Sequence, residues 1–199
     1  MKVPVAKALF NSHSYPEYRK RVSDLLLEGK STGNEQSDDL THYSTLNETR
    51  MNRLDKTMKI TDENSLKLKS LKGEYIWLVI SEGWCGDAAQ ILPIIHKMAE
   101  ESGKIELKIV LRDENEDLMN LFLTNKAKAI PIVIVIDKQT GDVMGNWGPR
   151  PKGAADLINK YKKEFGALDE TEKTDLQLWY LHDKGLTTQE ELINLTENL

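Results

Sequence analysis

The stretch that decides the fold reads Tyr75-Ile76-Trp77-Leu78-Val79-Ile80-Ser81-Glu82-Gly83-Trp84-Cys85-Gly86-Asp87-Ala88. Its first six residues form a nearly continuous aromatic and β-branched run, which is typical of a strand buried on both faces. A glycine-flanked turn follows, and we expect a helix from about Cys85 to Glu101. The turn therefore projects from the carboxyl end of a central strand, where open α/β proteins usually bind ligands.

The periodicity of the remaining chain predicts further strands and helices around this unit. We expect strands at 105–111, 132–136 and 143–147, the last two forming an antiparallel hairpin, and helices at 15–29, 37–58, 114–123, 151–165, 170–183 and 188–197, the last one starting after Thr187-Thr188. The predicted fold class is α/β, with a mixed central sheet flanked by helices. We expect a single domain over 1–199, with an N-terminal helical extension at 1–65, a core at 66–166 and a C-terminal helical extension at 167–199.

The helix at 37–58 carries an apolar stripe with helical spacing. Its members are Leu40, Tyr43, Asn47, Met51, Leu54 and Met58. The stripe either packs on the protein's own core or forms a surface for a homodimer or another partner, and the sequence does not separate the two.

The charge and the hydrophobic content of the chain exclude some kinds of partner and cellular location. The chain of 199 residues carries a formal net charge of -5, with 39% hydrophobic residues. No apolar run approaches the ~20 residues of a membrane span, and without a dense basic block we expect no nucleic-acid partner. The first seven residues lack the apolar core of a secretory signal, so we expect a cytoplasmic protein with no membrane partner.

Cys85 is the only cysteine, which rules out an internal disulfide and a cysteine-based zinc site. The four histidines lie far apart in sequence. The acidic cluster Asp113, Glu114, Glu116 and Asp117 at a predicted helix start complements the helix dipole more simply than it binds a cation. We expect no metal and no cofactor.

The position of Cys85 at the start of a helix favours reactivity. Free backbone N–H groups and the positive end of the helix dipole both stabilise a thiolate over a thiol. We therefore expect Cys85 to be accessible and partly ionised.

Three motifs resemble those of the thioredoxin superfamily: Trp84-Cys85-Gly86, Pro93 inside the following helix, and Ala129-Ile130-Pro131-Ile132-Val133. The resemblance covers roughly residues 70–165 and is greatest to bacterial thioredoxin-like proteins with helical extensions at both ends. It implies that Pro131 is a cis-proline lying against Cys85, and that the Ile130 backbone and Gly148 border the substrate groove.

The sequence departs from the thioredoxin pattern at three positions. Ala88 stands where the second motif cysteine is usual, Val79 stands where a buried acid is usual, and Asp87 replaces a proline. Without a resolving cysteine, a mixed disulfide must be released by a thiol of another molecule. The charge of Asp87 lies near the sulfur and should oppose thiolate formation.

Two functions remain open. The first is a thiol-disulfide oxidoreductase that acts through Cys85 by a monothiol mechanism on glutathione, another small thiol or protein thiols, with a groove shaped by Trp84, Gly86, Asp87 and Ala88. The second is a non-catalytic thioredoxin-like interaction module in which Cys85 has no turnover. Iron–sulfur binding with glutathione and peroxide reduction have weaker support, because the residues that follow Cys85 differ from the Gly-Phe-Ser of monothiol glutaredoxins and no companion threonine and arginine is evident.

Overall fold

The computed structural model describes residues 2–166 and 170–199. Its helices are α1 (Val3–Phe10), α2 (Tyr15–Leu27), α3 (Asp38–Thr57), α4 (Asp62–Ser70), α5 (Gly86–Ser102), α6 (Glu116–Met119), α7 (Lys152–Phe165), α8 (Glu170–Asp183) and α9 (Leu186–Glu197). Its strands are β1 (Tyr75–Ser81), β2 (Ile105–Leu111), β3 (Ile132–Asp137) and β4 (Val143–Trp147). The expected start of the C-terminal extension at 167 falls outside the described residues.

The strands form one mixed sheet in the order β2-β1-β3-β4. β1 runs parallel to β2 and antiparallel to β3, and β4 closes the sheet as the second strand of a hairpin with β3. Val79 pairs with Ile109 on one side and Val133 on the other. This arrangement confirms the α/β fold class and explains why the apolar run in β1 is almost continuous, since both of its faces are covered.

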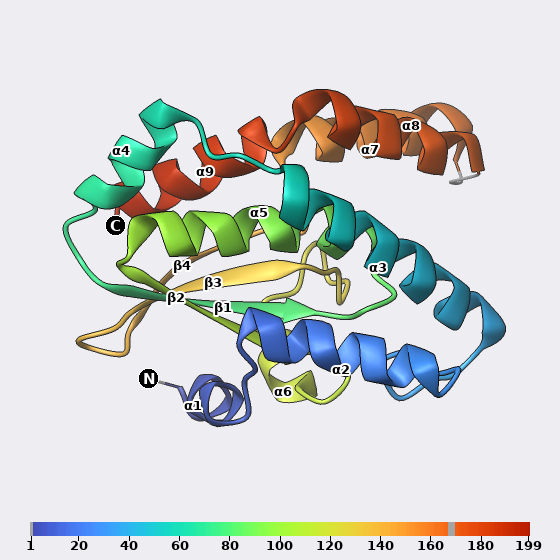
Figure 1. Cartoon of the computed structure of the whole chain (residues 1–199), viewed down its shortest axis with the longest axis horizontal. Coiled ribbons are helices and arrows are strands. Elements are labelled where there is room, and N and C mark those ends of the chain that lie inside the picture. Colours follow the sequence, from blue (N-terminus) through green and yellow to red (C-terminus); the bar gives the residue numbers. More distant parts are fainter. Residues whose placement is uncertain (1, 167–169) are drawn as a thin grey trace.

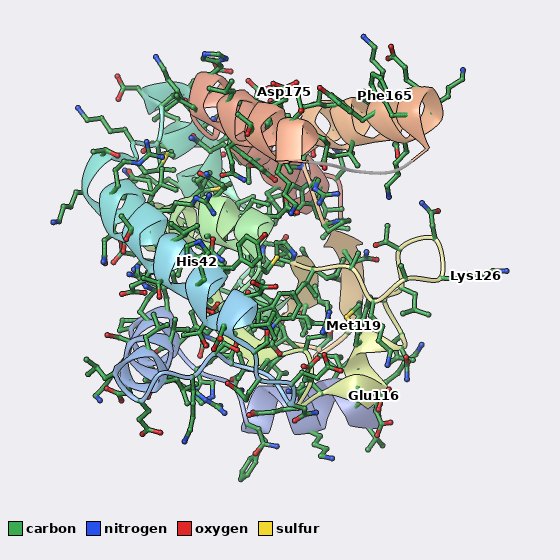
Figure 2. The ribbon with its side chains drawn as sticks, turned by 90° about the vertical axis from the view of Figure 1, so that its right-hand side faces the viewer. His42, Glu116, Met119, Lys126, Phe165 and Asp175 are labelled. Carbon is green, nitrogen blue, oxygen red and sulfur yellow. The ribbon has the colours of Figure 1, made fainter. Side chains whose placement is uncertain are left out.

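Helices cover both faces of the sheet (Figure 1). α5 lies on one face, with α3, α4 and α9 packed against it, while α1, α2 and α6 lie on the other face. α7 and α8 run side by side above α5 in Figure 1, and Phe165 and Asp175 mark them in the side view of Figure 2. The carboxyl end of β1 is therefore enclosed by helices from both chain extensions.

Local sequence explains how α5 begins and ends. Cys85 occupies the N-cap position with an extended backbone, and its sulfur accepts a hydrogen bond from the N–H of Ala88. Pro93 lies inside the helix, as predicted, and Gly103 ends it with a positive φ of 62°. A left-handed residue at this position is favourable for glycine, which has no Cβ to clash.

The apolar stripe on α3 packs mainly on the protein's own core. Asn47, Met51, Leu54 and Met58 are buried, and α3 contacts α5. Tyr43, nearer the start of the helix, is exposed. The interpretation as core is thus correct for the C-terminal part of the stripe.

Four features of the helices were not predicted correctly. α1 and α4 were missed, because each spans fewer than ten residues and gives a weak periodic signal. α6 is a single turn instead of a helix over 114–123. The chain then turns through Asn125 and Lys126, which have positive φ values, at the loop tip where Figure 2 labels Lys126. α9 begins after Gly185, so Thr187 and Thr188 lie inside it.

No helix in the ranges 2–166 and 170–199 combines the length and the apolar character needed to cross a bilayer.

Candidate functional site

The structure brings Cys85 and the proline-led strand together. The Cys85 thiol donates a hydrogen bond of 3.4 Å to the carbonyl oxygen of Ile130, and its Sγ lies 3.5 Å from the Ala88 amide nitrogen that donates to it. The peptide bond between Ile130 and Pro131 is cis. Cys85, Ala88, Ile130 and Pro131 therefore form one site at the carboxyl end of β1.

Cys85 is buried, contrary to our expectation of an accessible, partly ionised thiol. Only 8% of the residue is exposed. Burial, followed by the negative charge of Asp87, raises the pKa of the thiol to about 12, and hydrogen bonds from the Ala88 and Asp87 amides and the charge of Arg150 oppose this only in part. The helix N-terminus does favour the thiolate, but the loss of hydration on burial favours the thiol more strongly. At neutral pH the resting site holds a protonated thiol.

Asp87 links the cysteine motif to two distant segments. Its Oδ2 lies 2.7 Å from a guanidinium nitrogen of Arg150, in the loop after β4, and its Oδ1 accepts a 2.8 Å hydrogen bond from the Tyr180 hydroxyl on α8. Next to this pair, Gln90 donates a 2.7 Å hydrogen bond to Gln177 of α8. α8 is therefore bound directly to the first turns of α5.

Two glycines of the site are in close contact with neighbouring segments. A Cβ on Gly148, whose φ is +122°, would lie 2.2 Å from the carbonyl oxygen of Pro131, so Gly148 lies against the proline loop. A Cβ on Gly86 would lie 3.8 Å from the guanidinium of Arg50 and 4.0 Å from Gln177. Gly86 therefore faces α3 and α8.

The Trp84 side chain belongs to a neighbouring surface. It is half-buried beneath the guanidinium of Arg112, 4.7 Å from the ring centre, and lines a pocket with Asn34, Leu40 and Asp113. Cys85 does not line that pocket. The backbone of Trp84 precedes the cysteine, but its indole covers the strand end on the side of the loop between α2 and α3.

Arg50 is a cation placed beside the motif by a buried amide. Asn47, fully buried, donates a 2.9 Å hydrogen bond to the Gly83 carbonyl and accepts a 2.8 Å bond from Arg50. Burial and the charge of Arg53 lower the pKa of Arg50. Within the described chain Arg50 has no carboxylate partner, so its guanidinium can bind an anion near Gly86.

The family of the chain follows from the comparison of this site and fold with known proteins. A family model described as thioredoxin matches residues 33–163, which is well over half of the chain. The chain belongs to the thioredoxin family.

Solved structures show the same fold in more distant proteins. A protein of unknown function from Pseudomonas aeruginosa superposes with a TM-score of 0.59 at 18% identity, over 94% of this chain and 98% of the other. An HIV epitope scaffold superposes with a TM-score of 0.57 at 19% identity, over 94% of this chain and 99% of the other. No curated protein matches the sequence significantly. Because these likenesses cover 94% of the chain, they extend beyond the matched thioredoxin segment.

This thioredoxin-family site includes residues that the sequence analysis missed. Arg150 and Tyr180 contact Asp87, and the buried Nε of Arg150 has no hydrogen-bond partner among the described residues. Glu82, three residues before the cysteine, is fully buried, and its Oε1 accepts a 3.0 Å bond from the Asp113 amide while Oε2 has no partner among the described residues. Burial raises the pKa of Glu82. Arg150 lies two residues after Gly148, and this position in the sequence was the only indication that it belongs to the site. The packing of α8 against the site could not be predicted from periodicity.

The acidic cluster of this thioredoxin-family protein is used in ion pairs. Glu114 pairs with Arg21, Glu116 pairs with Lys128, and Asp113 lies 2.8 Å from Arg112. No group of three or more His, Cys, Asp or Glu residues with the geometry of a metal site occurs in the part of the chain that the structure describes.

Proposed function

We propose that the protein carries out thiol–disulfide exchange through Cys85 alone, by a monothiol mechanism. The observation that carries this proposal is the contact between the Cys85 thiol and the Ile130 carbonyl, next to Pro131. A disulfide-bearing peptide that paired with this strand would bring its sulfur toward Sγ, since an extended substrate uses main-chain hydrogen bonds of this kind.

The exchange needs no group beyond the two substrates. The Cys85 thiol loses its proton to solvent, the thiolate attacks one sulfur of a disulfide R–S–S–R, a new bond forms between Cys85 and one R–S group, and the other leaves as R–S⁻. A second external thiolate then attacks the R–S sulfur of the mixed disulfide and releases the Cys85 thiolate. Ala88 cannot resolve the intermediate, so both halves of the cycle use external thiols.

The raised pKa of Cys85 sets the speed of this reaction. With a thiol pKa of about 12, the thiolate fraction at neutral pH is far below that of a free cysteine. Exchange therefore requires a conformation in which Tyr180 and Arg150 move away from Asp87 and water reaches the sulfur.

The substrate class is a disulfide that carries carboxylates, such as oxidised glutathione, or a mixed disulfide on an acidic protein segment. Arg50 near Gly86 and the unpaired Nε of Arg150, among the described residues, supply donors for such anions. The proposal includes a bacterial cytoplasmic location, where reduced small thiols would serve the second half of the cycle.

A second candidate is a non-catalytic interaction module, and the burial of Cys85 favours it. A buried lone cysteine with a high pKa behaves as a small apolar residue and is inert. In that case the strand beside Pro131 would bind a partner peptide without any covalent step.

Intact mass separates the two candidates. The wild type and Cys85→Ser are incubated with oxidised glutathione and then with reduced glutathione. We expect one glutathionyl adduct in the wild type, absent in Cys85→Ser and released by the reduced thiol. If no adduct forms in the wild type or in Tyr180→Phe, which loosens α8, the exchange proposal is wrong and the module remains.

A further inference from the structure

A separate pocket of about 420 Å³ lies where α3 and α5 meet the segment that joins α8 to α9. Its volume falls within the ~300–1,000 Å³ range of small-molecule sites. Cys85 and Pro131 do not line it. Gln90 and Tyr180 do line it, so the pocket borders the thiol site, although a ligand bound there needs no exchange reaction at Cys85.

The floor and one wall of the pocket are apolar. Leu54, Met58 and Ile94 are buried at its base. Leu181, in the last turn of α8, and Leu186, the first residue of α9, are 50% and 42% exposed and also line it. A ligand with a hydrocarbon body would cover these two leucines and remove their surface from water.

The rim of the pocket is cationic. Arg53, Lys59 and Lys184 line it together with no acidic side chain among the described lining residues. None of the three forms an ion pair within residues 2–166 and 170–199, whereas Lys67, Lys69 and Lys152 on other surfaces each pair with an acid.

The positive charge of the rim continues along α3. Arg50 lies one turn before Arg53, and the charge of Arg53 contributes to the lowered pKa of Arg50. Like charges one turn apart on a helix repel each other. An anion bound at the rim would relieve this repulsion and pair with Arg53.

We propose that this pocket binds a small amphipathic carboxylate, with its hydrocarbon chain on Leu54, Ile94 and Leu181 and its carboxylate at Arg53. Lys59 and Lys184 complete the charge complementarity. The apolar base disfavours highly charged metabolites, and the unpaired cations at the rim disfavour cationic amphiphiles.

Isothermal titration calorimetry with decanoate tests the proposal on the full chain. Decanoate should bind at one site, while acetate, which lacks the chain, and decyltrimethylammonium, which reverses the charge, should not. Cys85→Ser should bind decanoate as tightly as the wild type, which keeps this result independent of the exchange reaction.

Two variants and one matched control locate the site. Arg53→Gln should weaken decanoate binding roughly tenfold or more, the expected loss of a charged hydrogen bond, and Leu181→Ser should also weaken it. Lys56→Gln removes the same charge from an exposed position of α3 outside the pocket and should leave the affinity unchanged. Absence of decanoate binding, equal binding of decyltrimethylammonium, or equal weakening by Lys56→Gln would overturn the proposal.

Discussion

Tyr180 on α8 donates a 2.8 Å hydrogen bond to Asp87, two residues after the single cysteine. This bond connects α8, in the C-terminal part of the chain, to the segment that contains the cysteine. Because Asp87 lies beside Cys85, we expect that movement of α8 away from Asp87 would change the hydration of the thiol.

Tyr180→Phe should increase the rate of Cys85 alkylation by iodoacetamide several-fold. The variant loses a hydrogen bond to a charged group, worth about 1.5–3 kcal/mol, so α8 should open more often and expose the sulfur. Tyr161→Phe is the control, because it removes a Tyr–Asp hydrogen bond between α7 and α8 that does not involve Asp87. A lower stability without faster alkylation would show that α8 does not shield the thiol.

Asp87→Asn should lower the pKa of Cys85 below its value of about 12. Removing the carboxylate removes a charge that opposes the thiolate, and it leaves the Arg150 cation near the sulfur without its partner. The pH dependence of thiolate absorbance in the ultraviolet measures this shift. Breaking this partly buried pair, in which the Arg150 side chain is 26% exposed, should also cost about 1.5–3 kcal/mol of unfolding free energy, measurable in urea. An unchanged or higher pKa would contradict the proposed role of Asp87.

Arg50→Gln should slow the reaction of Cys85 with oxidised glutathione about tenfold, by loss of a charged hydrogen bond to a substrate carboxylate. The rate with the neutral disulfide of mercaptoethanol should not change, since that substrate has no carboxylate. Lys56→Gln controls for the general loss of one positive charge on α3. Equal slowing of both disulfides would indicate that Arg50 acts on the fold and not on the substrate.

Ala88→Cys should create a dithiol site. Ala88 is buried one helical turn after Cys85, and its amide already contacts Sγ. We expect a disulfide between Cys85 and the introduced thiol, together with reductase activity in an insulin-precipitation assay, both absent from the wild type. If the disulfide forms but reduction stays slow, Val79→Asp in the same background tests whether the missing buried acid limits the rate.

Glu82→Gln should stabilise the protein increasingly as the pH rises above the ordinary carboxyl value of 4.5. The pKa of Glu82 is raised in the folded protein. As the pH rises above 4.5, Glu82 therefore ionises in the unfolded chain while it stays protonated in the folded protein, and the wild type loses stability. Glutamine does not titrate and keeps an oxygen for the Asp113 amide. Urea unfolding from pH 4 to 8 measures the difference in unfolding free energy between the variant and the wild type, with Glu35→Gln at an exposed position as the control. A difference that does not change with pH would contradict the raised pKa of Glu82.

The sequence predicted the parts of this site that depend on local pattern. The run before Cys85 indicates a central strand, and Pro131 begins the next buried strand, so their juxtaposition follows from the family topology. The protonation state of the thiol could not be predicted from the sequence, because burial in the folded protein outweighs the local effect of the helix start. The hydrogen bonds of Tyr180 and Gln177 to Asp87 and Gln90 could not be predicted either, because both residues lie far beyond the cysteine in the chain and no periodicity indicates their partners. The rest of the sheet and most helices were predicted because their apolar patterns span enough residues.

The matched thioredoxin segment ends at residue 163, before the helix that supplies Tyr180 begins. A fragment trimmed to the recognised family boundaries would therefore keep the cysteine, the proline loop and the sheet, yet lose the Tyr180 hydroxyl that bonds Asp87. Assays on such a fragment would report a cysteine whose neighbouring carboxylate has lost one of its two partners, and the reactivity measured that way would not describe the whole protein.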